Sequence, residues 1–117
     1  MSQVIVEERM YTLQVGKVPE FMAVYEREGL PYLRKHLGNM VGFFINEVGP
    51  QNLIVHLWAY DSFAERDKRR AALAADPGFA AIRPKIQPWI MSQETRIMRP
   101  AAFFEPVLKN MLKAGSP

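Results

Sequence analysis

Three side chains that could take part in chemistry alternate along the segment LIVHLWAY at residues 53–60: His56, Trp58 and Tyr60. Alternate residues of a strand share one face of a sheet, so an imidazole, an indole and a phenol are expected to lie side by side. Only His56 has an unperturbed pKa near neutrality and is therefore the candidate catalytic base. We favour a structural or interface role for His56 over ligand binding, and ligand binding over catalysis. Trp58 and Tyr60 are favoured as packing groups over a platform for a substrate.

A second set of polar and aromatic side chains occupies the odd positions of the first predicted strand: Glu7, Arg9 and Tyr11. The parity of this strand stays open, because the even set contains Glu8. If the odd positions face the same cavity as His56, the mixture could bind a small aromatic or carboxylate ligand. A Glu7–Arg9 ion pair that satisfies itself across a dimer interface is the favoured alternative, since buried charges must be paired. Asn46 could reach this face from the second strand.

Composition excludes several classes of function. The chain has no cysteine and two histidines among 117 residues, which removes thiol chemistry and disulfides and leaves little for a metal site. Phosphate-binding glycine loops and hydrolase motifs are missing from the sequence, and we expect no cofactor. The net charge is only +3, and the one basic cluster, Lys68-Arg69-Arg70, follows Glu65, Arg66 and Asp67 on a predicted helix. We interpret this cluster as a solvated helix face with pairs at i,i+4, not as a nucleic-acid site.

No apolar run approaches the roughly 20 residues that a membrane span needs. The opening MSQVIVEERM also lacks the features of a signal peptide. We therefore expect a soluble cytoplasmic protein that makes no membrane span.

The pattern of elements predicts the fold class. Strands are expected at residues 4–13 and 92–99, and a hairpin at 41–60. Pro19 opens a helix that ends before Gly38 and is kinked near Gly29 and Pro31. Helices follow at residues 63–75 and from residue 77. A capping box is expected at the start of the first of these, in which the Ser62 hydroxyl accepts from the Glu65 N–H and the Glu65 carboxylate reaches back. The order is βαββαβ, an α+β ferredoxin-like domain with a four-stranded antiparallel sheet over residues 1–100. A tail follows at 101–117, in which residues 105–112 could form one or two helical turns.

Helices cover one face of such a sheet. We expect the face of residues 53, 55, 57 and 59 to bury against them. The opposite face would then carry Phe44, Ile54, Trp58 and Tyr60, which is too apolar to remain in water. This predicts a homodimer in which two sheets face each other.

Several segments resemble the NIPSNAP family over roughly residues 4–100. They are VEERMYTL at residues 6–13, EVGPQN at 47–52 and, most specifically, HLWAYDS at 56–62 with Arg66 and Arg70 behind it. The resemblance implies a dimeric α+β-barrel and no established catalytic residues. Related barrels include cofactor-free monooxygenases, dehydratases, lactone isomerases and haem-degrading proteins, so the fold does not choose a reaction.

Two functions of different class remain open. The first is a dimer that binds a small molecule in the barrel interior, through Glu7, Arg9, Tyr11, Asn46, His56, Trp58 and Tyr60. The alternative is a cofactor-independent oxygenase or isomerase that acts on a small aromatic or lactone substrate. In that case His56 would be the base, and Tyr60 or Arg9 would stabilise the anion.

Overall fold

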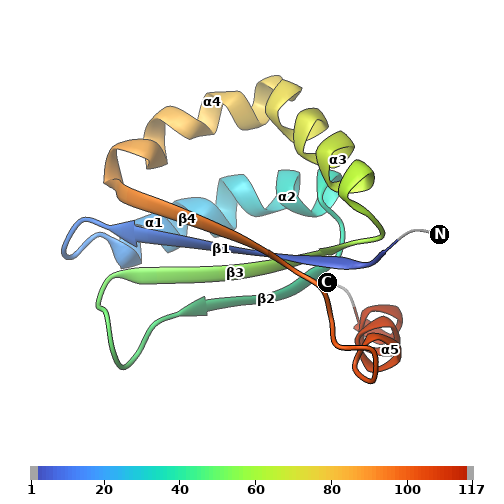
Figure 1. Cartoon of the computed structure of the whole chain (residues 1–117). Coiled ribbons are helices and arrows are strands. Elements are labelled where there is room, and N and C mark those ends of the chain that lie inside the picture. The colour runs from blue at the N-terminus through green and yellow to red at the C-terminus, as the bar shows by residue number, and fades with distance from the viewer. Residues whose placement is uncertain (1–2, 116–117) are drawn as a thin grey trace.

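The computed structural model describes residues 3–115, with side chains for residues 3–113. It contains one antiparallel sheet with the strand order β2-β3-β1-β4 (Figure 1). The strands are β1 (Ile5–Leu13), β2 (Met40–Ile45), β3 (Leu53–Tyr60) and β4 (Ile90–Met98). The helices are α1 (Val18–Val24), α2 (Leu30–His36), α3 (Phe63–Ala75), α4 (Pro77–Ile86) and α5 (Glu105–Gly115), with a π-helical turn η1 (Tyr25–Gly29) and a 3₁₀ turn η2 (Gln87–Trp89). The predicted α+β ferredoxin-like fold is confirmed.

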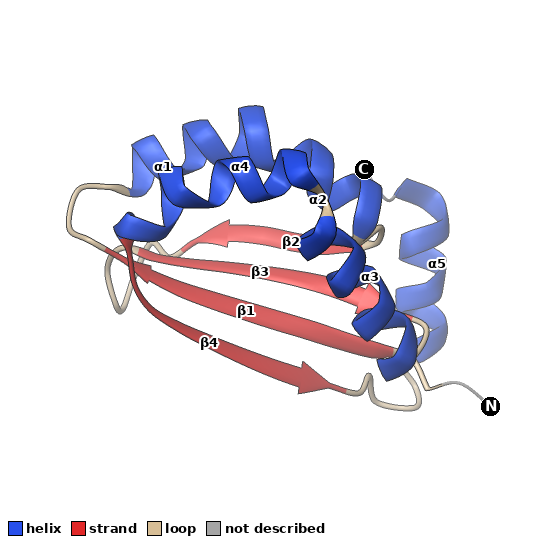
Figure 2. Cartoon of the chain, turned by 90° about the horizontal axis from the view of Figure 1, so that it is seen from above, coloured by secondary structure: helices blue, strands red, loops and turns tan. Residues whose placement is uncertain are grey.

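The helices lie on both faces of the sheet. Figure 2 shows α1, α2, α3 and α4 as a layer over one face. In Figure 1, α5 lies below the sheet, at one end of the opposite face. We call the first the helical face and the second the open face. Most of the hydrophobic core lies between the sheet and the helical layer, and a smaller cluster lies under α5.

The kink expected in the first helix takes the form of a π-helical turn. The N–H of Leu30 donates to the carbonyl of Tyr25, five residues earlier, and a regular α-helix resumes at once. Pro31 explains why the π-helical turn lies at this position, because a proline has no N–H and its ring would collide with the carbonyl four residues before it. A wider turn relieves that collision without ending the helix.

Local capping signals fix the ends of the helices. The Ser62 hydroxyl accepts from the N–H of Glu65 at 3.1 Å, as predicted. The Glu65 carboxylate accepts instead from Nε of Arg69 at 2.8 Å, so the second half of the predicted capping box does not form. Gly38 ends α2 with a φ of 83°, a conformation that glycine adopts without steric cost. Asp76 caps α4 through the N–H of Gly78.

The predicted orientation of β3 was wrong. Ile54, His56, Trp58 and Tyr60 are all at most 2% exposed, and they lie on the helical face, not on the open one. The helices supply large aromatic partners on this face, Phe21 and Tyr25 among them. Packing the aromatic residues of β3 against these rings buries more apolar area than packing its smaller aliphatic residues would. The aliphatic residues of β3 lie on the open face, where Leu57 and Ala59 belong to the cluster under α5.

The C-terminal segment packs on the open face of the sheet. It forms the 11-residue helix α5, longer than the one or two turns expected. Leu108 is 2% exposed and packs with Val4, Val6 and Ala59. Beyond α5 the open face still carries Phe44, which is 57% exposed, as the sequence predicted for this residue.

Candidate functional site

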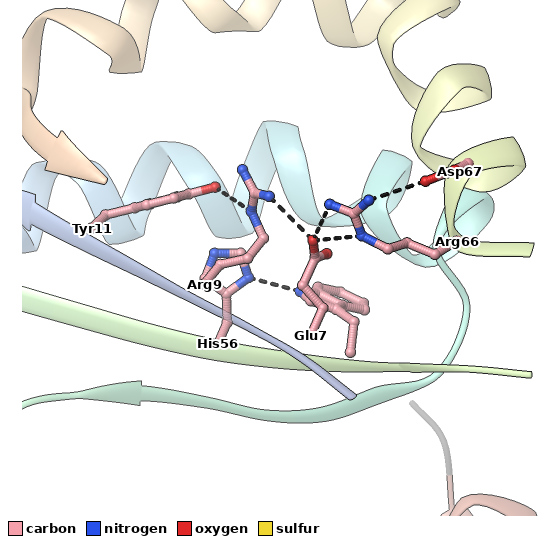
Figure 3. A network of polar contacts seen from close by, with 7 residues as sticks. Glu7, Arg9, Tyr11, His56, Arg66 and Asp67 are labelled. Carbon is pink, nitrogen blue, oxygen red and sulfur yellow. Dashed lines mark hydrogen bonds and ion pairs between the residues drawn. The ribbon is translucent and has the colours of Figure 1, made fainter. Parts of the chain in front are cut away.

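The two candidate sets of the sequence come together on the helical face. β1 and β3 are adjacent, and their register places Arg9 opposite His56 and Glu7 opposite Trp58. Figure 3 shows the side chains of Glu7, Arg9 and His56 on the side of the sheet that the helices cover. The odd positions of β1 therefore do share a face with His56, which settles the parity that the sequence left open. That face lies under the helices, so these side chains do not line the space between two sheets.

Glu7 is the most buried charged group of the site, with no exposed surface. Its Oε2 accepts from Nε and Nη2 of Arg66 at 2.8 and 2.6 Å, and Nη1 of Arg9 lies 3.5 Å away (Figure 3). Arg66 comes from α3, one turn after the Ser62 cap, so the start of this helix decides where the guanidinium falls. Glu7 is thus paired with two arginines of its own chain, and not across a dimer interface as expected.

His56 is held as a neutral imidazole. The indole N–H of Trp58 donates to Nδ1 of His56 at 2.7 Å, and because an indole nitrogen can only donate, the proton of the ring resides on Nε2. Burial, with Arg9 and Arg70 adding positive charge, lowers the pKa of His56 to about 3. Phe43 stacks on the ring with centroids 4.6 Å apart. His56 at neutral pH is therefore a hydrogen-bond donor.

Three buried polar atoms of this face have no hydrogen-bond partner among the described residues: Oε1 of Glu7, Nε2 of His56 and the hydroxyl of Tyr60. Burial, and after it the charge of Glu7, raises the pKa of Tyr60 to about 12, so the hydroxyl keeps its proton. The set offers one acceptor and two donors. Buried polar groups are normally satisfied, and a group left open marks a place for a water or a ligand atom.

A cavity of about 130 Å³ lies beside this cluster, between the sheet and the helices. Tyr11 separates it from His56, whose ring it meets edge-on with centroids 5.0 Å apart. The walls come from β1, η1, α3, α4, η2 and β4: Arg9, Tyr11, Tyr25, Arg70, Leu73, Ala74, Phe79, Arg83, Ile86, Gln87, Ile90 and Gln93. Of the residues predicted to bind a ligand, Arg9 and Tyr11 line this cavity, while Glu7, His56, Trp58 and Tyr60 lie behind its wall.

Sequence reasoning missed Tyr25, Arg70 and Arg83 as lining residues. It assigned Arg70 to a solvated face, an interpretation that suits Lys68, which is exposed, and Arg69, which pairs with Glu65 at i,i+4. Arg70 follows Arg66 by four residues and precedes Leu73 by three. Helical spacing therefore places it on the face that packs toward the sheet, and this was the available signal.

Asn46 does not belong to the site. Its amide donates to the carbonyls of Val48 and Pro50, at 3.1 and 2.7 Å, and holds the exposed loop between β2 and β3. The expectation that Asn46 reaches the face of His56 was wrong, because the side chain satisfies the turn locally.

The other histidine, His36, contacts Oδ2 of Asp76 at 2.7 Å, and this contact lowers the pKa of Asp76.

Within residues 3–115, no three side chains of the types His, Asp and Glu are grouped to hold a metal ion. Over the same residues no helix combines the length and the apolar character needed to cross a membrane.

Comparison with known proteins identifies the family. The NIPSNAP family model matches residues 6–105. The chain belongs to the NIPSNAP family. Among curated NIPSNAP relatives, human NipSnap homolog 3A is 38% identical over 71 residues, which cover 60% of this chain and 28% of that protein. Zebrafish NipSnap homolog 2 is 32% identical over 96 residues, covering 82% of this chain and 33% of that one. The chain thus spans a third or less of the length of these relatives.

Solved NIPSNAP structures share the fold closely. A NIPSNAP family protein with unknown function from Agrobacterium tumefaciens is 43% identical with a TM-score of 0.84, over 87% of this chain and 92% of that one. An uncharacterised NIPSNAP-like domain protein from Burkholderia xenovorans is 38% identical, also with a TM-score of 0.84, over 88% and 90%. A Nitrosomonas europaea protein provisionally described as an antibiotic biosynthesis monooxygenase is 12% identical with a TM-score of 0.62, over 87% and 94%, which is a likeness of fold alone.

Proposed function

We propose that this NIPSNAP protein binds a small molecule in the cavity between its sheet and its helical layer. The observation that carries the proposal is the composition of this cavity, where charged, aromatic and apolar side chains from six elements converge on one partly enclosed space. A pocket with an apolar body and a few convergent polar groups is the usual form of a ligand site. The proposal therefore moves the site from the barrel interior, where the sequence placed it, to the inside of each protomer.

The unpartnered polar atoms behind the cavity support the same proposal. Nε2 of His56 and the hydroxyl of Tyr60 are donors at the sheet surface, and Oε1 of Glu7 is an acceptor beside them. A water ordered behind the cavity wall would satisfy atoms that the protein leaves open. Glu7, His56, Trp58 and Tyr60 would then position a ligand from behind the wall that Arg9 and Tyr11 form.

A screen of small fragments by NMR, with a blocked cavity as comparison, tests this proposal. Ala74 lines the cavity from α3, so Ala74→Phe would fill part of the space. Ala72 is exposed on the same helix and does not line the cavity, so Ala72→Phe is the matched control. We expect fragments that shift the amide signals of Tyr11, Leu73 and Ile90 to lose affinity in Ala74→Phe and to keep it in Ala72→Phe. Fragments that bind both variants equally well would contradict the assignment.

The geometry favours binding over the enzymatic alternative of a cofactor-independent oxygenase or isomerase. Nδ1 of His56 is occupied by the Trp58 N–H and Nε2 carries the proton, so the ring has no free lone pair with which to accept a proton. A pKa lowered to about 3 leaves an imidazole a very weak base at neutral pH. Tyr60 and Arg9 were the groups expected to stabilise an anion, but without His56 as a base no such anion would form.

We also propose a homodimer formed through the open face of the sheet. Phe44 is 57% exposed there and Met98 37%, and Val55, which lies opposite Phe44 in the sheet, is half-buried. Exposed apolar side chains on a sheet face are costly to leave in water. The interface residues differ from those expected, since Trp58 and Tyr60 are buried on the helical face.

Sedimentation velocity of a charged variant tests the dimer. The Phe44 ring lies over Gly42, whose missing side chain makes room for it, and Phe44→Lys would place two charges across a symmetric interface. We expect the wild type to sediment as a dimer and Phe44→Lys as a monomer. Val15→Lys, at a loop position that is 86% exposed, should remain dimeric. A monomeric wild type, or a dimeric Phe44→Lys, would contradict this proposal.

A cytoplasmic location is part of the same proposal. It rests on the lack of cysteine in the sequence, which excludes disulfides and so fits a reducing compartment. Fractionation of the source cells with an antibody to the protein would test it, and recovery in the membrane fraction would contradict it.

A further inference from the structure

The cavity under the helices collects guanidinium groups from three separate elements. Arg9 comes from β1, Arg70 from α3 and Arg83 from α4. Among its lining residues in the described part of the chain there is no aspartate or glutamate. The cavity is therefore a region of positive potential with low-dielectric walls, the arrangement that concentrates anions.

Two of these arginines have no acidic partner among the side chains of residues 3–113. Arg9 is engaged by its neighbours, since its Nε donates to the Tyr11 hydroxyl at 3.0 Å and its Nη1 lies 3.5 Å from Glu7. Arg70 and Arg83 take part in none of the ion pairs between the described side chains. In this respect Arg70 differs from the other two arginines of α3.

On that helix, Arg66 pairs with Glu7 and Arg69 pairs with Glu65. Arg70 is half-buried and is directed at the cavity instead. A guanidinium directed into a partly enclosed space is stabilised by an anion there, and its fork of N–H groups matches a carboxylate. The positive charge is also felt behind the wall, where after burial itself Arg9 and Arg70 lower the pKa of His56.

The remaining walls determine the size and nature of the ligand body. The buried rings of Tyr11 and Tyr25 face Leu73, Phe79 and Ile86 across a space of about 130 Å³. A cavity of about 150 Å³ lined by apolar groups holds one benzene ring. The space is therefore suited to a single ring or a short branched chain.

From this arrangement we infer that the ligand is a small organic anion with a carboxylate on a ring-sized apolar body. The inference rests on the proposed function and makes it specific: Arg70 and Arg83 bind the carboxylate, Arg9 adds charge at the floor, and the tyrosine rings and aliphatic groups contact the body.

Benzoate and its neutral isostere benzamide are the probes, because they share a shape and differ in charge. NMR titration of the full chain at millimolar ligand should show benzoate shifting the amide signals of Tyr25, Leu73 and Ile90. Benzamide should bind at least about tenfold more weakly, the usual size of a lost charge-assisted hydrogen bond. Equal affinity for the two probes, or no binding of benzoate at all, would overturn the inference. Neutral fragments that bind the cavity in the screen with Ala74→Phe would leave the proposed function intact in either case.

Single substitutions test which arginines bind the carboxylate of benzoate. Arg70→Gln and Arg83→Gln should each weaken benzoate binding by about three- to tenfold and leave benzamide unchanged. Arg83 is exposed, so Arg83→Gln is expected to fold even if Arg70→Gln does not. Arg34→Gln is the matched control, since Arg34 is an exposed arginine of α2 that does not line the cavity. An equal loss of benzoate affinity in Arg34→Gln would show a general effect of net charge and would overturn the assignment.

Discussion

The indole N–H of Trp58 and Nδ1 of His56, two residues apart on one strand, are joined by a hydrogen bond of 2.7 Å. Both side chains are at most 1% exposed, and the contact fixes the tautomer of the imidazole. A histidine that the sequence offers as a base is in this way used as the acceptor for an indole. The other ring nitrogen, Nε2, carries the N–H and has no hydrogen-bond partner among the described residues.

The neutral state of His56 makes stability depend on pH. In the unfolded chain a histidine binds a proton near pH 6.5, whereas in the folded protein burial lowers the pKa of His56 to about 3. The unfolded state therefore binds more protons between these values, and the free energy of unfolding falls as the pH falls, by up to about 1.4 kcal/mol per pH unit.

His56→Asn keeps an acceptor for Trp58 and removes this titration. The difference in the free energy of unfolding between wild type and His56→Asn should shrink by about 2 kcal/mol from pH 6.5 to pH 4.5. Denaturant titrations at three pH values measure it, and His36 cancels because both proteins contain it. Parallel pH profiles for the two proteins would show that His56 is not buried as a neutral ring.

Removal of Arg66 should destabilise the fold strongly. Arg66→Met leaves the buried Glu7 carboxylate with Arg9 alone, and breaking a buried pair from one side costs about 3 kcal/mol. Arg69→Met on the same helix is the matched control, because Arg69 pairs with a part-exposed Glu65 and should cost less than about 1 kcal/mol. Adding Glu7→Gln to Arg66→Met should recover part of the loss. Equal losses for Arg66→Met and Arg69→Met would contradict the buried pairing.

The packing of α5 can be tested at neighbouring positions. Leu108→Ala should lower the free energy of unfolding by about 2 kcal/mol or more, since Leu108 is 2% exposed. Val107→Ala should change it by less than about 0.5 kcal/mol, because Val107 is 49% exposed. Urea denaturation of the two variants measures both values. Similar small losses at both sites would mean that α5 does not dock on the sheet in solution.

Ser62→Ala should lower the free energy of unfolding by about 1 kcal/mol, the usual cost of an N-cap removed. The bond lost is the one from the Glu65 N–H to the hydroxyl at 3.1 Å. Ser92→Ala, at an exposed position of β4, should have no measurable effect. If the two substitutions cost the same, the hydroxyl of Ser62 is not a cap.

The sequence predicted the elements well because their signals are local. The Ser62 cap, the Gly38 stop and the proline at the start of the first helix each act within one turn, and the βαββαβ order follows from them. The face of β3 could not be predicted in the same way. A period of two divides a strand into two sets but does not say which set meets the helices.

The convergence of the cavity's side chains on one space could not be predicted from local patterns. Arg70 and Arg83 belong to helices that lie far from β1 in sequence, and only their packing brings them to Arg9. Asn46 was misplaced for the opposite reason, because its local bonds to Val48 and Pro50 satisfy the side chain where it stands. The division into a domain at 1–100 and a tail at 101–117 remains a prediction, although α5 packs on the sheet.

The π-helical turn has a consequence for the phase of the first helix. Its buried residues recur every four positions, at Phe21, Tyr25, Gly29, Leu33 and Leu37. In a regular α-helix a step of four residues rotates the side chain by about 40° more than a full turn. Residues spaced by four would therefore turn progressively away from the sheet along the helix. The wide turn at Tyr25–Gly29 takes up one residue's worth of rotation. The turn thereby brings Leu33 and Leu37 back into phase with Phe21, so that one continuous apolar stripe of the helix stays against the sheet.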